Sequence, residues 1–195
     1  MKVDIIVLAA GSSKRMGSPK QLLKVGETTL LGTILKTVVQ SKANNVTCVL
    51  GANASLITPS ISKFEIEIVI NPNYSNGLGT SISKGVSHLK DRDIDGVIIL
   101  LGDQPFISSN YINKLVTTFS EEPHHIISTK YANKNGVPAL FPKKYFNQLL
   151  LLNKDKGAQD ILNNSLDFIK TLELVPNLKD IDTPTDYQNL TKTYL

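Results

Sequence analysis

The chain has 195 residues, of which 41% are hydrophobic and 19% charged, and its formal net charge is +4. This composition predicts one folded domain over residues 1–195 with an ordinary apolar core, and it excludes a disordered chain. The single cysteine, Cys48, excludes a disulfide scaffold, and no apolar run reaches the roughly 18 residues that a membrane-spanning helix needs.

The excess of positive charge lies in one short segment. Residues 1–26 contain five basic side chains against one acidic side chain, Asp4, whereas residues 27–195 carry equal numbers of both. A nucleic-acid-binding surface is normally a broad basic stripe, so we expect no nucleic-acid partner. The apolar run at residues 5–10 is too short for a signal peptide and is followed at once by a polar loop. We therefore expect a cytoplasmic protein.

Short apolar runs that predict strands alternate with segments of helical periodicity. Strands are predicted at residues 3–8, 46–50, 65–70, 96–101, 125–129, 137–141 and 168–172. Helices are predicted at residues 29–42, 79–89, 108–119, 145–152 and 156–163, and a last short helix starts at Pro184. The strand at 137–141 contains Pro138, which cannot donate a ladder hydrogen bond, so we expect it at the edge of the sheet. The alternation predicts an α/β fold with a doubly wound, mostly parallel sheet.

The loop after the first predicted strand has the composition of a phosphate-binding loop. Residues 8–22 read LAAGSSKRMGSPKQL. Gly11 and Gly17 allow backbone N–H groups to face an anion, and Arg15 and Lys20 supply positive charge. The loop is neither a Walker loop nor a G-x-G-x-x-G loop, because Ser13 stands at the second glycine position and no Gly-Lys-Ser/Thr follows. An ordinary turn with solvated basic side chains is the alternative.

Two aspartates are candidates to hold a metal ion that accompanies a triphosphate. Asp103, in LGDQPF, follows the most apolar predicted strand and so lies at the same sheet edge as the first loop. Asp182, in DIDTPTDY, precedes the last helix. Mg²⁺ prefers one or two carboxylates together with phosphate oxygens. Both residues have simpler alternatives, since Asp103 can cap the next turn and Asp182 can cap the helix that Pro184 starts.

The pattern L-A-A-G-x-S-x-R-M-G-x-P-K resembles the signature of the MobA-like NTP transferases. The resemblance implies a Rossmann-like, three-layer fold of the nucleotide-diphospho-sugar transferase type. It implies that the first loop wraps an NTP, with Arg15 and Lys20 on its phosphates, and that Asp103 and Asp182 hold Mg²⁺. The nucleotide-binding residues it implies in this loop are Leu8, Ala9, Ala10, Gly11 and Ser13.

Three further strings are similar to those of one branch of this family, the molybdenum cofactor cytidylyltransferases. NPNYSNGLGTSISKG (71–85) resembles the segment beside the base and sugar, which adds Gly79 and Ser81 to the nucleotide site. GVPALF and DKGAQD resemble acceptor-side motifs, which implies that Pro138, Lys156 and Gly157 lie near the acceptor. The branch usually has arginine where this chain has Gln159, and that departure leaves the acceptor open.

The resemblance implies a Mg²⁺-dependent nucleotidyltransferase. We expect it to move CMP from CTP to the terminal phosphate of molybdopterin and to release pyrophosphate, with Arg15, Lys20 and Asp103 as the catalytic residues. A molybdoenzyme would receive the product. The alternatives are transfer from GTP, transfer to a sugar, polyol or isoprenoid-precursor phosphate, and a non-catalytic accessory protein that binds a nucleotide or cofactor.

Overall fold

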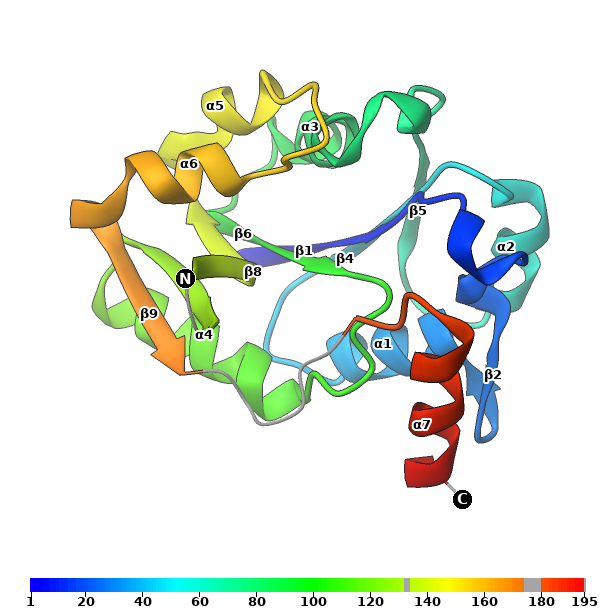
Figure 1. Cartoon of the computed structure of the whole chain (residues 1–195). Helices are drawn as coiled ribbons and strands as arrows, with labels where there is room; N and C mark the ends of the chain where they lie inside the picture. The colour runs from blue at the N-terminus through cyan, green and yellow to red at the C-terminus, as the bar shows by residue number, and fades with distance from the viewer. Residues whose placement is uncertain (132–133, 174–179, 195) are drawn as a thin grey trace.

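A central sheet has the strand order β5-β4-β1-β6-β8-β7-β9 in the computed structural model, which describes residues 1–131, 134–173 and 180–194 (Figure 1). The strands are β1 (Val3–Ala9), β4 (Val46–Leu50), β5 (Glu67–Ile70), β6 (Gly96–Leu101), β7 (Ile126–Tyr131), β8 (Lys134–Pro142) and β9 (Ile169–Glu173). A separate two-stranded ribbon pairs β2 (Lys24–Val25) with β3 (Thr28–Thr29).

The sheet is mostly parallel, and its central strands are buried on both faces. Every residue of β1 and β4 is buried, as continuous apolar strands of a parallel sheet usually are. Ile5 of β1 lies beside Val46 on one side and Ile98 on the other, and both pairings are parallel. The predicted α/β class is confirmed.

The predicted position of the strand that contains Pro138 is wrong. β8 is not an edge strand but pairs antiparallel with both β6 and β7. Its pairing with β6 begins at Ala139, and the register with β7 shifts between Ser128 and Thr129, so that Pro138 lies in an irregularity without a ladder partner. A proline inside a sheet is tolerated at such a bulge. The Thr129 hydroxyl donates to the Pro138 carbonyl oxygen at 2.6 Å.

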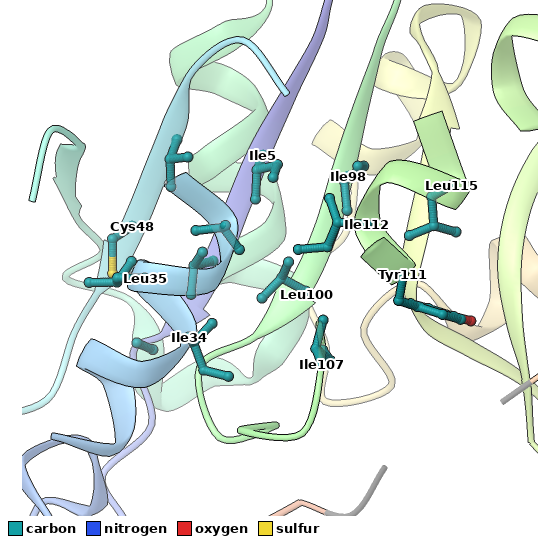
Figure 2. Close-up of a cluster of buried hydrophobic side chains, with 14 of the residues drawn as sticks. Ile5, Ile34, Leu35, Cys48, Ile98, Leu100, Ile107, Tyr111, Ile112 and Leu115 are labelled. Carbon is teal, nitrogen blue, oxygen red and sulfur yellow. The ribbon is translucent and has the colours of Figure 1, made fainter. Parts of the chain in front are cut away.

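Helices cover both faces of the sheet (Figure 1). α1 (Leu30–Val39), α2 (Ala54–Ile61) and α4 (Ser109–Glu121) contribute to one apolar cluster, part of which Figure 2 shows. α3 (Leu78–Leu89), α5 (Phe146–Leu150) and α6 (Gln159–Asn164) contribute to the cluster on the opposite face. α7 (Pro184–Tyr194) packs near β2, and Leu190 belongs to a third cluster with Val25 and Leu30. None of the helices described here is both long enough and apolar enough to cross a membrane.

Among the helices of the described ranges, α2 is the one longer than a single turn that the sequence analysis does not predict. It contains Pro59, which usually ends a helix, and it buries only Ile57 and Ile61. These two residues are four positions apart, so they face the core together from one side of a short helix. The loops that follow β1 and β6 leave the same edge of the sheet, because these strands run parallel. This edge carries the candidate site.

Candidate functional site

The loop after β1 is held in shape by hydrogen bonds from two of its own side chains. Gln21 is only 3% exposed, and its Nε2 donates to the carbonyl oxygens of Ala9 and Gly11 at 3.0 and 2.9 Å. The Ser13 hydroxyl donates to Gln21 Oε1 at 3.3 Å and accepts from the Lys20 backbone N–H at 3.1 Å. Ser13 itself has a φ of 54°, a left-handed conformation that few residues other than glycine adopt.

The sequence analysis missed Gln21 and assigned Ser13 to nucleotide binding. The structure places the Ser13 hydroxyl inside the hydrogen-bond network of the loop, so its predicted contact with a nucleotide stays a prediction. Gln21 carried one available signal, since it directly follows Lys20 in the motif. A long amide there can satisfy the carbonyl groups that the turn leaves without partners.

An ion-pair cluster joins the loop after β1 to two other segments. Lys20 Nζ lies 2.5 Å from Asp103 Oδ2 and 2.8 Å from Asp182 Oδ1. Arg15 Nη2 lies 2.9 Å from Asp182 Oδ2. Asp103 follows β6 and Asp182 precedes α7, so the fold brings together four side chains that the sequence analysis names as catalytic or metal-binding residues.

The charges in this cluster shift the ionisation of its members. Burial raises the pKa of Asp103, and the attraction of Lys20 offsets only part of that rise. Burial lowers the pKa of Lys20, but the two carboxylates outweigh it and the net direction is upward. The pKa of Asp182 is lowered. Burial alone would raise it, but hydrogen bonding and charge attraction from Lys20 and Arg15 outweigh the effect of burial. Lys20 therefore stays charged between its partners.

One oxygen of the cluster has no hydrogen-bond donor in the part of the chain that the structure describes. Among the residues that the structure describes, no group donates a hydrogen bond to the buried Oδ1 of Asp103. A buried carboxylate oxygen without a donor is costly unless a ligand or a cation completes it. The acidic side chains described here form no cluster of three or more that would hold a metal ion by themselves. A cation at Asp103 and Asp182 would thus take part of its coordination from a ligand.

A cavity of about 550 Å³ opens beside the cluster. Its lining includes five of the seven residues predicted to bind the nucleotide, Leu8, Ala9, Ala10, Gly11 and Ser81, together with Lys20 and Asp103. It also includes Tyr74 and Asp155, which the sequence analysis did not name. The volume is within the range of pockets that hold small molecules and cofactors.

Gly79 and Asn71 do not line this cavity but hold in place the segments that do. A Cβ on Gly79 would lie 2.7 Å from the Lys154 carbonyl oxygen, so glycine allows α3 to pack closely against that segment. The side chain of buried Asn71 donates to the hydroxyls of Thr80 and Ser81 at 2.9 and 3.0 Å. These bonds hold the first turn of α3 against the end of β5. No short sequence motif indicates these packing and hydrogen-bonding roles of Gly79 and Asn71.

A second cavity of about 290 Å³ lies next to the first and shares Leu8, Leu78 and Leu101 with it. Lys156 and Gln159 line it, as the acceptor-side prediction expects for this segment. Pro138 does not line it, although its neighbour Val137 does. Gly157 is also absent from the lining, and its positive φ of 57° turns the chain tightly against Leu78. The roles predicted for these residues stay predictions.

The chain is similar to known proteins over most of its length. A family model described as the MobA-like NTP transferase domain matches residues 5–169. The purine catabolism protein PucB of Bacillus subtilis (strain 168) is 29% identical over 194 residues, which cover 93% of this chain and 92% of PucB. The nicotine blue oxidoreductase of Paenarthrobacter nicotinovorans is 32% identical over 131 residues, which cover 66% of this chain and 61% of that protein.

Solved structures resemble the whole fold. The crystal structure of Rv0371c from Mycobacterium tuberculosis H37Rv has a TM-score of 0.88 at 27% identity, with 98% of each chain covered. A crystal structure of Rv0371c in complex with manganese has a TM-score of 0.83 at 25% identity, covering 99% of this chain and 100% of that one.

The ion-pair cluster predicts a specific pattern of stability at neutral pH. Lys20→Met leaves Asp103 and Asp182 without their shared cation, so we expect the free energy of unfolding to fall by about 2–4 kcal/mol. Adding Asp103→Asn removes one buried charge, so the double variant should recover about 1–2 kcal/mol. Urea denaturation of the unaltered protein, Lys20→Met, Asp103→Asn and the double variant measures this coupling. Lys36→Met, at an exposed position on α1, is the matched control. Additive losses would contradict the cluster.

Proposed function

The chain belongs to the MobA-like NTP transferase family, and from this premise we propose that it is a Mg²⁺-dependent cytidylyltransferase acting on molybdopterin. In the proposed reaction, an oxygen of the terminal phosphate of molybdopterin bonds to the α-phosphorus of CTP. The bond from that phosphorus to the β-phosphate oxygen breaks, and pyrophosphate leaves. The observation that carries the proposal is the meeting of Arg15, Lys20, Asp103 and Asp182 beside a cavity of about 550 Å³.

The carboxylates fit a hard divalent cation. Asp103 has a buried oxygen to which no described residue donates a hydrogen bond. Asp182 pairs with Lys20, the same lysine that pairs with Asp103. Oxygen ligands in small number suit Mg²⁺, which normally completes its shell with phosphate oxygens and water. The manganese complex of Rv0371c supports a divalent cation in a protein of this fold. Bound there, the ion would act as a Lewis acid on the phosphate oxygens.

Lys20 and Arg15 would exchange partners when a nucleotide binds. Both side chains pair with carboxylates in the structure, and a triphosphate offers them a stronger concentration of negative charge. Their transfer to the phosphates would stabilise the negative charge of the leaving pyrophosphate and would free oxygens of Asp103 and Asp182 for the cation. The attacking phosphate is already ionised, so the reaction needs positioning and charge neutralisation rather than a general base.

The choice of CTP and molybdopterin rests on sequence resemblance rather than on the relatives. The first loop contains A-A-G, and residues 71–85 resemble the cytidylyl branch. The names of PucB and nicotine blue oxidoreductase indicate activities that differ from each other, and neither name includes a cytidylyl acceptor. Gln159, in place of the usual arginine, is the one observation that favours a different phosphorylated acceptor.

The reaction can be tested by pyrophosphate release. We expect the purified protein to release pyrophosphate when CTP, Mg²⁺ and molybdopterin are all present, and at a lower rate with GTP. Asp103→Asn should lower kcat by about 100-fold or more, because a cation ligand supplies several kcal/mol of transition-state stabilisation. Asp91→Asn, at an exposed turn, is the matched control. Full turnover by Asp103→Asn would exclude the proposed metal role, and release only with other acceptor phosphates would replace molybdopterin.

Cation and nucleotide should bind cooperatively, because Lys20 occupies the carboxylates when neither is present. We expect a small thermal shift with Mg²⁺ alone and with CTP alone, and a shift larger than their sum with both. Lys20→Met should increase the shift with Mg²⁺ alone, since the competing cation is gone. Thermal denaturation with each ligand combination measures this. Simple additivity in the unaltered protein would exclude the partner exchange.

A further inference from the structure

A residue that lines the second cavity carries a buried hydrogen-bond acceptor that no described residue satisfies. Gln104 lies between Asp103 and Pro105, is only 2% exposed, and is one of the residues that line this cavity. Within the described part of the chain, nothing donates a hydrogen bond to Gln104 Oε1. A buried amide oxygen without a donor lowers stability, and such a group in a cavity indicates a ligand that completes it.

The orientation of the Gln104 amide is determined by its neighbours. Its Nε2 donates to Asp180 Oδ1 at 2.9 Å and to the Tyr131 hydroxyl oxygen at 3.3 Å. Tyr131 uses its own proton to donate to the Val137 carbonyl oxygen at 2.5 Å. An ionised carboxylate only accepts, so a flipped amide would place two acceptors against each other at Asp180. Both N–H bonds of Gln104 are therefore used, and among the described residues its Oε1 is the side-chain atom without a partner.

The rest of the cavity offers both an apolar surface and polar side chains to a ring system. Half of the residues that line it are apolar: Leu8, Leu78, Ile82, Leu101, Val137, Ala158 and Leu162. It joins the first cavity through Leu8, Leu78 and Leu101. Gln104 directly follows Asp103, and the two residues line the two adjoining cavities, so one molecule that spans both cavities would contact both residues. Small-molecule sites commonly combine such an apolar lining with a few directed polar groups.

We propose that Gln104 determines acceptor specificity by accepting a hydrogen bond from an N–H group on a flat heterocycle, with Asp180 and Tyr131 as positioning residues. The inference rests on the proposed function, because it takes the second cavity to be the acceptor side of the same site. Beyond that function, it assigns the recognition of the acceptor to Gln104 Oε1 and requires an N–H donor on the acceptor ring. A 2-amino pteridine ring carries such a donor, whereas its 2-oxo analogue carries an acceptor in the same place.

Binding of two small probes tests this assignment on the full chain. Fluorescence titrations with pterin and with lumazine, its 2-oxo analogue, measure the preference directly. We expect the unaltered protein to bind pterin about tenfold or more tightly than lumazine, because lumazine leaves Gln104 Oε1 facing another acceptor. Gln104→Met should reduce this preference to about one while the thermal shift with CTP and Mg²⁺ is retained. Gln148→Met, at an exposed position on α5, should keep the preference.

Several outcomes would overturn the assignment. These are no binding of pterin, equal binding of both probes by the unaltered protein, and a preference that persists in Gln104→Met. If Gln104→Met fails to fold, the comparison of the two probes on the unaltered protein still decides. Pyrophosphate release is scored separately. A pterin preference without pyrophosphate release would reject the proposed reaction and keep the role of Gln104, whereas release without a preference would do the reverse.

Discussion

The ion pairs of Lys20 with Asp103 and Asp182 are the interaction on which the rest of the site depends. They join three segments that are far apart in the chain: the loop after β1, the loop after β6 and the turn before α7. The parallel pairing of β1 with β6 brings the first two to one edge of the sheet. The third reaches that edge where the Ile181 N–H donates to the Asp103 carbonyl oxygen at 3.0 Å. A single ammonium group thus connects the elements that would bind phosphate and metal.

This arrangement gives the net charge of the chain a local meaning. The excess of +4 equals the charge of residues 1–26, and three of the five basic residues there lie in or beside the loop after β1. Arg15 and Lys20 are paired with acids from distant segments, while Lys14 lines the first cavity. Charge that looks like a surface excess in the sequence is mostly concentrated at one site. Such a site suits a small polyanion rather than a long nucleic acid.

The sequence predicted those features that a contiguous pattern encodes. The apolar runs marked the strands, and the motif around Gly11 and Lys20 marked the loop. The position of β8 was not predictable from Pro138 alone. A register shift against β7 leaves Pro138 without a ladder partner, so the N–H group that proline lacks is not needed there. The sequence analysis missed α2 because Pro59 argues against a helix and because only two of its side chains are buried, which gives a weak periodic pattern.

Amide side chains account for most of what the sequence could not reveal at the site. Gln21, Asn71 and Gln104 are all buried, and each is held by partners that only the folded chain brings near. Gln104 reaches Asp180, 76 residues later in the chain. Glutamine and asparagine are common on surfaces, so their type alone gives no reason to single them out. Their roles follow from burial and from which donors and acceptors are used.

The two adjoining cavities and the ion-pair cluster form one site, in which Lys20 holds the carboxylates together until a nucleotide and a cation bind. A crystal structure with CTP and Mn²⁺, with anomalous data collected at the manganese edge, tests it most directly. We expect a manganese peak bound by Asp103 and Asp182, with Lys20 Nζ on the phosphates. A peak elsewhere, or Lys20 still paired with both carboxylates beside bound CTP, would contradict it.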